Sequence, residues 1–172
     1  MLELAAGSTY TPIATNTLSS SATGITFSSI PSTYTDIVLV LSLISTSANN
    51  DVKVQVNSDS GTNYSETWLG GNGTSASSGR DSNTTSWASL KLAGTSTNSQ
   101  VFTFQFQNYA NTSTYKTMIW RSSIADKEVI AGVGLWRSTS AINTIYVYEA
   151  GNTSPATFAA GTTATIYGIS AA

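Results

Sequence analysis

The stretch Asp51-Val-Lys-Val-Gln-Val-Asn57 alternates apolar and polar side chains without a break. A period of two places the valines on one face of a strand and the polar residues on the other. The stretch Val101-Phe-Thr-Phe-Gln-Phe-Gln107 repeats this pattern with three phenylalanines. We therefore expect two half-buried strands, with Val54 and Phe104 buried on facing inner sheets.

Further strand patterns recur at short spacing along the chain, and convincing helical patterns do not. The run Ile37–Ile44 is almost continuously apolar, which suits a central strand covered on both faces. Pro12 falls inside the first pattern, which is therefore predicted to be an edge strand. About ten short strands without helices predict an all-β fold, an antiparallel two-sheet β-sandwich that is jelly-roll-like and forms a single domain over residues 10–172. The remaining patterns lie near residues 10–18, 24–28, 64–69, 87–92, 116–122, 129–136, 143–149 and 163–169.

Two segments between the predicted strands have distinctive compositions. Gly70–Thr85 is the longest predicted loop, and we expect it to be either mobile or ordered only by a neighbouring molecule. Asn57–Asn63 carries oxygen-bearing side chains at alternate positions, as calcium loops do, but Trp68 stands where an EF-hand has its final glutamate. A hairpin turn is the preferred interpretation of this segment, and calcium binding is the minor alternative.

The composition argues against an enzyme. The chain has no histidine and no cysteine, which removes the commonest general base, the usual catalytic triad and the commonest zinc ligands. A glycosidase needs two facing carboxylates, and the nine acidic residues leave such a pair open. Most of them, such as Asp59, Asp81 and Asp126, lie beside turn residues, which explains them without catalysis. We predict no catalytic residue, no metal ion and no cofactor.

The charge pattern also excludes several classes of partner. The net charge is −2, and the seven basic residues are scattered singly, whereas nucleic-acid binders need a basic stripe. No apolar run approaches the ~20 residues of a membrane helix. The first seven residues lack the basic region of a secretory signal. We therefore expect neither nucleic-acid nor membrane binding.

Candidate contact residues lie at the amino terminus and among the tryptophans. Met1, Leu2 and Leu4 are apolar but are separated from the first strand pattern by Gly7-Ser-Thr9, so residues 1–9 are predicted to form an arm that packs against a neighbouring subunit or shell. Trp68 and Trp87 are candidate contacts with a subunit or partner. Trp87 is the best candidate for exposure, because Ala88, Leu90 and Leu92 take the inward face in the predicted strand. The alternative is a tryptophan platform that stacks on a surface glycan.

Five segments occur along the chain in the order Ile25–Tyr34, Val56–Ser65, Asn108–Asn111, Gly134–Ile142 and Thr165–Ile169. Taken together, they resemble a pattern found in small virion proteins of tailed bacteriophages, especially those of cyanobacteria and marine bacteria. The segments span residues 25–169, and the resemblance extends to the strand pattern that begins near residue 10. One departure is Thr35-Asp36, where the pattern has a histidine after Tyr-Thr.

The resemblance implies a jelly-roll-like module on the outer surface of a virion, made in the host cytoplasm. Its expected role is that of a capsid decoration (cement) protein, a homotrimer bound to a major capsid protein. The alternative is the head domain of a tail fibre or receptor-binding appendage, bound to a tail protein. A carbohydrate-binding module is a third hypothesis, and an enzyme is the last.

Overall fold

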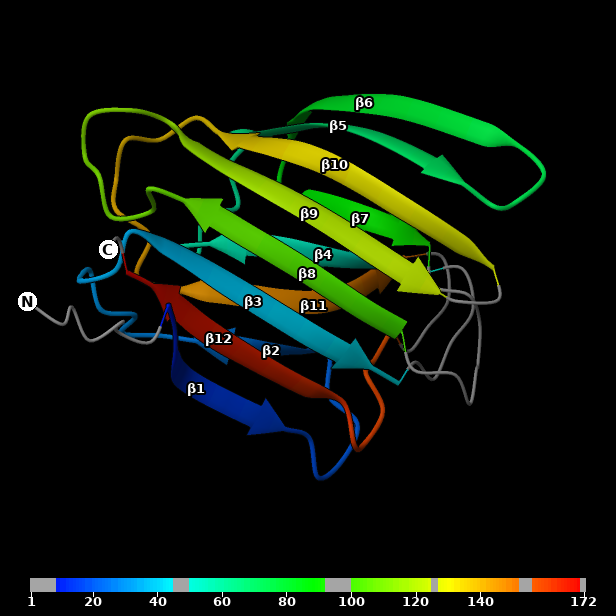
Figure 1. The fold of residues 1–172 in the computed structure, drawn as a ribbon, viewed down its shortest axis with the longest axis horizontal. Helices are drawn as coiled ribbons and strands as arrows, with labels where there is room; N and C mark the ends of the chain where they lie inside the picture. Colours follow the sequence, from blue (N-terminus) through cyan, green and yellow to red (C-terminus); the bar gives the residue numbers. More distant parts are fainter. Residues whose placement is uncertain (1–8, 45–49, 92–99, 125–126, 152–155, 171–172) are drawn as a thin grey trace, which may run out of the picture.

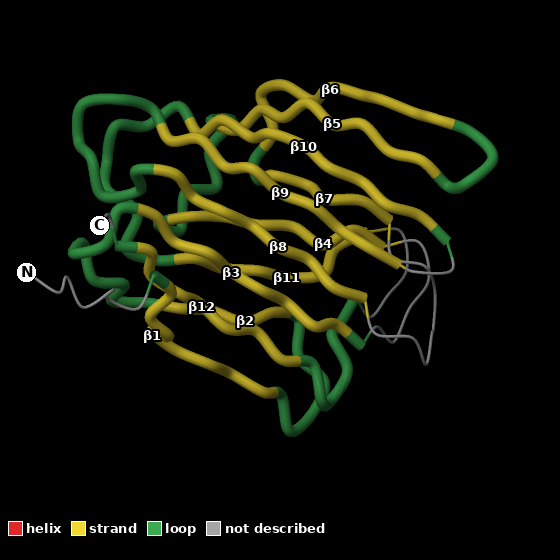
Figure 2. Tube along the Cα trace, viewed as in Figure 1, coloured by secondary structure: helices red, strands yellow, loops and turns green. Residues whose placement is uncertain are grey.

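The computed structural model describes residues 9–44, 50–91, 100–124, 127–151 and 156–170 (Figure 1). These residues form strands joined by turns and loops, and none of the described residues is helical (Figure 2). The twelve strands are β1 (Tyr10–Thr17), β2 (Gly24–Phe27), β3 (Asp36–Leu43), β4 (Asn50–Val56), β5 (Tyr64–Gly71), β6 (Ala76–Thr84), β7 (Trp87–Lys91), β8 (Gln100–Gln107), β9 (Lys116–Ile124), β10 (Glu128–Trp136), β11 (Ile145–Gly151) and β12 (Thr163–Ile169).

The strands form two antiparallel sheets that face each other (Figure 1). The larger sheet has the order β1-β12-β3-β8-β9-β10-β5-β6, and the smaller has the order β2-β11-β4-β7. The quartets β1-β12-β3-β8 and β2-β11-β4-β7 have the winding of a jelly roll. The other four strands, β9, β10, β5 and β6, extend the first quartet beyond β8. The predicted antiparallel jelly-roll-like sandwich is confirmed, with twelve strands instead of about ten.

The alternating stretches 51–57 and 101–107 form the strands β4 and β8, and the apolar faces of these strands meet in the core. Val54 on β4 is 1% exposed and Phe104 on β8 is 0% exposed, and both belong to one hydrophobic cluster between the sheets. The predicted alternation is therefore confirmed. The edge position predicted from Pro12 is also confirmed, because β1 is the first strand of the larger sheet.

The apolar run Ile37–Ile44 has a different environment from the one predicted. It forms β3, which lies in the middle of the larger sheet, and its inward residues, such as Leu39, are fully buried. On the outward side Val38 is also buried, at 5% exposure, whereas Val40 is half-buried and Ser42 is exposed. The prediction of a central strand is confirmed, but cover on both faces is found only at Val38 and is lost toward Ser42, because the second sheet lies on only one side of β3.

The predicted long loop Gly70–Thr85 is instead mostly a strand. β6 pairs with β5 along its whole length, so the two strands form a hairpin at the edge of the larger sheet. At the hairpin turn the Asn72 side-chain carbonyl accepts hydrogen bonds from the backbone N–H groups of Thr74 and Ser75. The Gly and Ser residues that indicated a loop therefore form a strand, because main-chain pairing with β5 outweighs their low strand propensity.

The segment Asn57–Asn63 is not a hairpin turn, because it connects β4 in the smaller sheet to β5 in the larger one. Its central carboxylate, on Asp59, accepts hydrogen bonds from the Gly61 N–H, the Asn63 amide and the Trp136 indole N–H. Burial alone would raise the pKa of Asp59, but these hydrogen bonds outweigh burial and lower it. The oxygen-bearing side chains therefore stabilise the segment that crosses from one sheet to the other.

Tyr64 lies under this crossing and makes the stability of the fold depend on pH in the alkaline range. Its hydroxyl contacts backbone atoms of Val56 and Asp59, and burial raises the pKa of Tyr64 from its usual value of about 10 to about 12. The folded state thus resists ionisation that the unfolded chain undergoes. The resulting stabilisation is complete below pH 10 and is lost as the pH rises through about 12.

We therefore expect the free energy of unfolding to fall as the pH rises from 10 toward 12, and Tyr64→Phe to reduce the slope of that fall. Urea unfolding of both proteins across this pH range measures the two slopes. The variant should be less stable at neutral pH, because it loses the hydroxyl contacts. Identical slopes in the two proteins would show that Tyr64 ionises as easily when folded as when unfolded.

Candidate interaction surface

The candidate surface is the outer face of the eight-stranded sheet, the face turned away from the smaller sheet. Side chains alternate between the two faces of each strand, so residues opposite one another in the register share this face. One such row joins Ile119 on β9, Val133 on β10 and Thr67 on β5. A second joins Arg121 and Ala131 across β9 and β10. The strands that extend the jelly roll, β9, β10, β5 and β6, therefore supply half of the strands of this surface.

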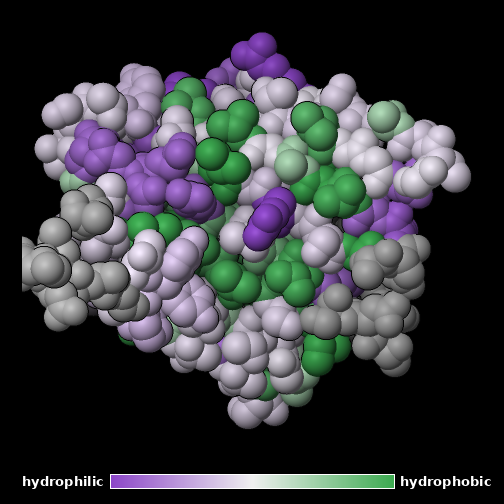
Figure 3. Space-filling view, in the orientation of Figure 1, coloured by the Kyte–Doolittle hydropathy of each residue, from purple (hydrophilic) through white to green (hydrophobic). Residues whose placement is uncertain are grey.

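The outer face collects exposed apolar side chains. Among the described residues, eight large hydrophobic side chains are exposed, and six of them lie on this face. Figure 3 shows apolar side chains gathered across its middle. A soluble monomer rarely leaves a contiguous apolar patch of this kind uncovered. The six are Tyr10 (54% exposed), Leu69 (66%), Val101 (38%), Ile119 (48%), Val129 (60%) and Val133 (49%).

Charge is sparse on this face, where the exposed Arg80 of β6, the register partner of Thr67, is one cation. Arg121 is exposed and lies between Thr103 of β8 and Ala131 of β10. Within the described part of the chain, no carboxylate forms an ion pair with it. Asp36, nearer one end of the sheet, accepts hydrogen bonds from the Gln105 amide and the Asn108 N–H. Among the described residues, Arg121 is therefore a cation without an ion-pair partner, surrounded by apolar and neutral side chains.

Two shallow depressions follow the apolar side chains. One, of about 420 Å³, has Leu69, Ala131 and Val133 in its lining. The other, of about 310 Å³, lies between Tyr10 and Arg121 and includes Val38 and Ile119. Both are open depressions on a broad sheet face and not enclosed cavities.

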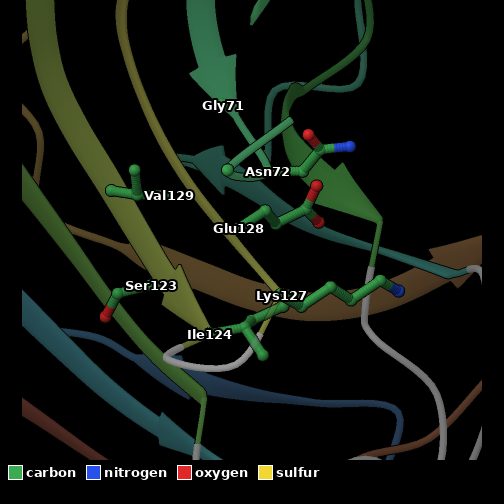
Figure 4. A pocket seen from close by; sticks show the side chains of 8 residues that line it. Gly71, Asn72, Ser123, Ile124, Lys127, Glu128 and Val129 are labelled. Atoms are coloured by element: carbon green, nitrogen blue, oxygen red, sulfur yellow. The ribbon is translucent and has the colours of Figure 1, made fainter. Parts of the chain in front are cut away.

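A third depression lies at the rim, where the β5–β6 turn is close to the end of β9 and the start of β10 (Figure 4). Its volume is about 360 Å³, and its lining includes Asn72, Lys127 and Glu128. The Asn72 carbonyl is already engaged by its own turn. Among the residues seen in Figure 4, Glu128 is the only carboxylate, so the rim offers no facing pair of acids.

Two buried charged side chains, Lys116 and Glu149, form hydrogen bonds within the fold. The Lys116 ammonium donates to the backbone carbonyls of Thr114 and Thr139, and burial lowers the pKa of Lys116. The Glu149 carboxylate accepts a hydrogen bond from the Asn50 amide. No group of three or more acidic residues in the described ranges could hold a metal ion. The absence of catalysis and of a metal remains a prediction.

The predicted contact residues lie in different environments. Trp87 is 1% exposed, so the prediction that it is exposed is wrong. Its register partner is Val54, which points into the core, and its indole N–H donates to the Leu135 carbonyl. Trp68 is half-buried and packs against the core. Met1, Leu2 and Leu4 lie outside the described residues.

Sequence reasoning missed the apolar residues of the outer face. Their signal was present in β9 and β10, where Met118-Ile-Trp120 and Val129-Ile-Ala131 are apolar at successive positions. A strand that is apolar at successive positions presents apolar side chains on both of its faces. That pattern does not say whether the second face is buried by the same chain or exposed.

The fold and this surface define a class of protein, a jelly-roll β-sandwich that presents a broad and nearly uncharged sheet face. No family model matches the chain, and no curated protein or solved structure shows significant similarity to it. Among the described residues no helix is long and apolar enough to cross a membrane.

Proposed function

We propose that this protein is a non-enzymatic structural protein of a virus particle, a capsid decoration (cement) protein that binds and stabilises the outer shell of a tailed phage. The observation that carries the proposal is the outer face of the eight-stranded sheet, which holds six of the eight exposed large hydrophobic side chains of the described residues. The segments that resemble phage virion proteins support the choice of particle.

The size of the outer face suits a protein partner. Eight strands about 4.8 Å apart span roughly 34 Å, and seven residues at about 3.3 Å each span roughly 23 Å. The product is roughly 800 Å², which is the area that one partner contributes to a specific protein interface of standard size. A glycan or small molecule would leave most of such a face uncovered.

The composition of the face also favours a protein partner. Charged residues are depleted at the centres of protein interfaces, and charged residues make up only 9% of this chain. Neutral Ser, Thr and Gln side chains accompany the apolar ones, and they cost less to desolvate than ion pairs do. A cement protein needs a rigid fold with such a face, because it adds buried area across the seams between shell subunits.

A tail-fibre or receptor-binding head domain is the alternative within the same particle. The surface of such a head domain would have the same chemistry as that of a decoration protein. The number of copies per particle therefore distinguishes the two roles. Quantitative mass spectrometry of purified particles is expected to find hundreds of copies. A few copies to a few dozen would indicate a tail appendage, and none would contradict a virion role altogether.

The role of the outer face is tested by charged substitutions at exposed positions. Leu69→Asp and Val133→Asp should leave the melting temperature nearly unchanged, because the two side chains are 66% and 49% exposed. Both should lower occupancy when the protein is added back to particles that lack it. Thr26→Asp, at an exposed position on the smaller sheet, is the matched control. Equal occupancy for all three variants would overturn the assignment of this face.

A further inference from the structure

The middle of the outer face, formed by β9 and β10, lacks a partner within the described chain. We infer that residues 1–8 of a neighbouring copy cover it. This inference rests on the proposed function, since it names an occupant for the same face. It joins the predicted arm to a defined surface: Leu2 and Leu4 would cover Ile119 and Val133.

Tyr10 shows that the chain enters β1 beside this face. The Tyr10 ring packs edge-on against Tyr167, with the ring centroids 6.2 Å apart. It also lines the depression that contains Val38 and Ile119. The residues that precede Tyr10 therefore begin at the border of the apolar surface, and those of an adjacent copy would do the same on its own sheet.

The charge on the face favours this segment over a second copy of the face itself. Face-to-face pairing of two identical sheets would bring two Arg121 cations into one interface, and like charges there cost energy. Residues 1–8 instead carry Glu3 between Leu2 and Leu4. The long Arg121 side chain can extend beside such a segment, with its stem on apolar surface and its guanidinium near the carboxylate.

Chain length favours a neighbouring copy over the same chain. From β1 to β9 the sheet order spans four strand spacings, about 19 Å. Leu4 lies six residues before Tyr10, and six fully extended residues reach about 20 Å. Within one chain the segment would therefore have to be taut to place Leu4 on Ile119. A segment from an adjacent copy starts at that copy's own Tyr10, so its reach is not measured against the four strand spacings of one sheet, and it can follow the face in a relaxed conformation.

Disulfide trapping tests the inference directly, because the natural chain has no cysteine. The full chain carrying Leu4→Cys and Ile119→Cys is oxidised and separated on a non-reducing gel. We expect covalent oligomers to form several-fold faster than in the matched control, Leu4→Cys with Thr26→Cys, whose second position is exposed on the smaller sheet. Reversing the charge with Arg121→Glu should slow the trapping, and adding Glu3→Arg should restore it.

Two outcomes would overturn the inference. An intramolecular disulfide, seen as a monomer of altered mobility, would place the segment on its own chain. Equal trapping rates in the test and control pairs would show that the segment does not select this face. The experiment uses purified protein without particles, so its failure is distinct from the loss of particle occupancy that tests the proposed function.

Discussion

Replacing Phe104 with alanine is expected to lower the free energy of unfolding by about 3–5 kcal/mol. Phe104 is 0% exposed, and its ring stacks on Phe102 with centroids 6.4 Å apart. It lies on β8 between Leu39 of β3 and Trp120 of β9 in the register, all on the inner face. Truncation would leave a cavity that these large neighbours cannot fill without moving.

Chemical denaturation of the wild type and Phe104→Ala measures this loss. Val101→Ala on the same strand is the matched control, because Val101 is 38% exposed on the opposite face and its truncation should cost little. A loss under ~1 kcal/mol for Phe104→Ala, typical of exposed positions, would mean that the inward face of β8 is misassigned.

Gly132→Ala is the second large effect that we expect. Gly132 is the register partner of Trp120, and an added Cβ would lie 2.6 Å from the Trp120 ring atom Cε2. Trp120 is 1% exposed, so its ring has no open space to move into. We expect the substitution to destabilise the fold by about 1–3 kcal/mol through overpacking.

Gly71→Ala on the adjacent strand is the matched control, because a Cβ there meets only the Ser75 carbonyl oxygen at 3.7 Å. Thermal melting of both variants should show a clear decrease for Gly132→Ala alone. A double-mutant cycle with Trp120→Phe tests the cause, since a smaller ring should reduce the cost of the added Cβ. If Gly132→Ala costs the same beside phenylalanine, the tryptophan ring is not the source of the effect.

The sequence by itself determined the fold class and much of the core. An alternation of period two is a local property, so it identified the strands β4 and β8 and the burial of Val54 and Phe104 without any tertiary information. Pro12 likewise identified the edge strand, because a missing N–H is tolerated only where no neighbour needs it.

Only the tertiary structure decided how the strands are joined and which faces are covered. β6 has a loop-like composition and exists because β5 pairs with it. Trp87 is buried because β7 takes its register from β4. Ile119 and Val133 are apolar like core residues, yet they are exposed because β9 and β10 extend a sheet that the smaller sheet covers on one side only. Burial depends on which layer lies opposite a side chain, and long-range strand pairing sets that layer.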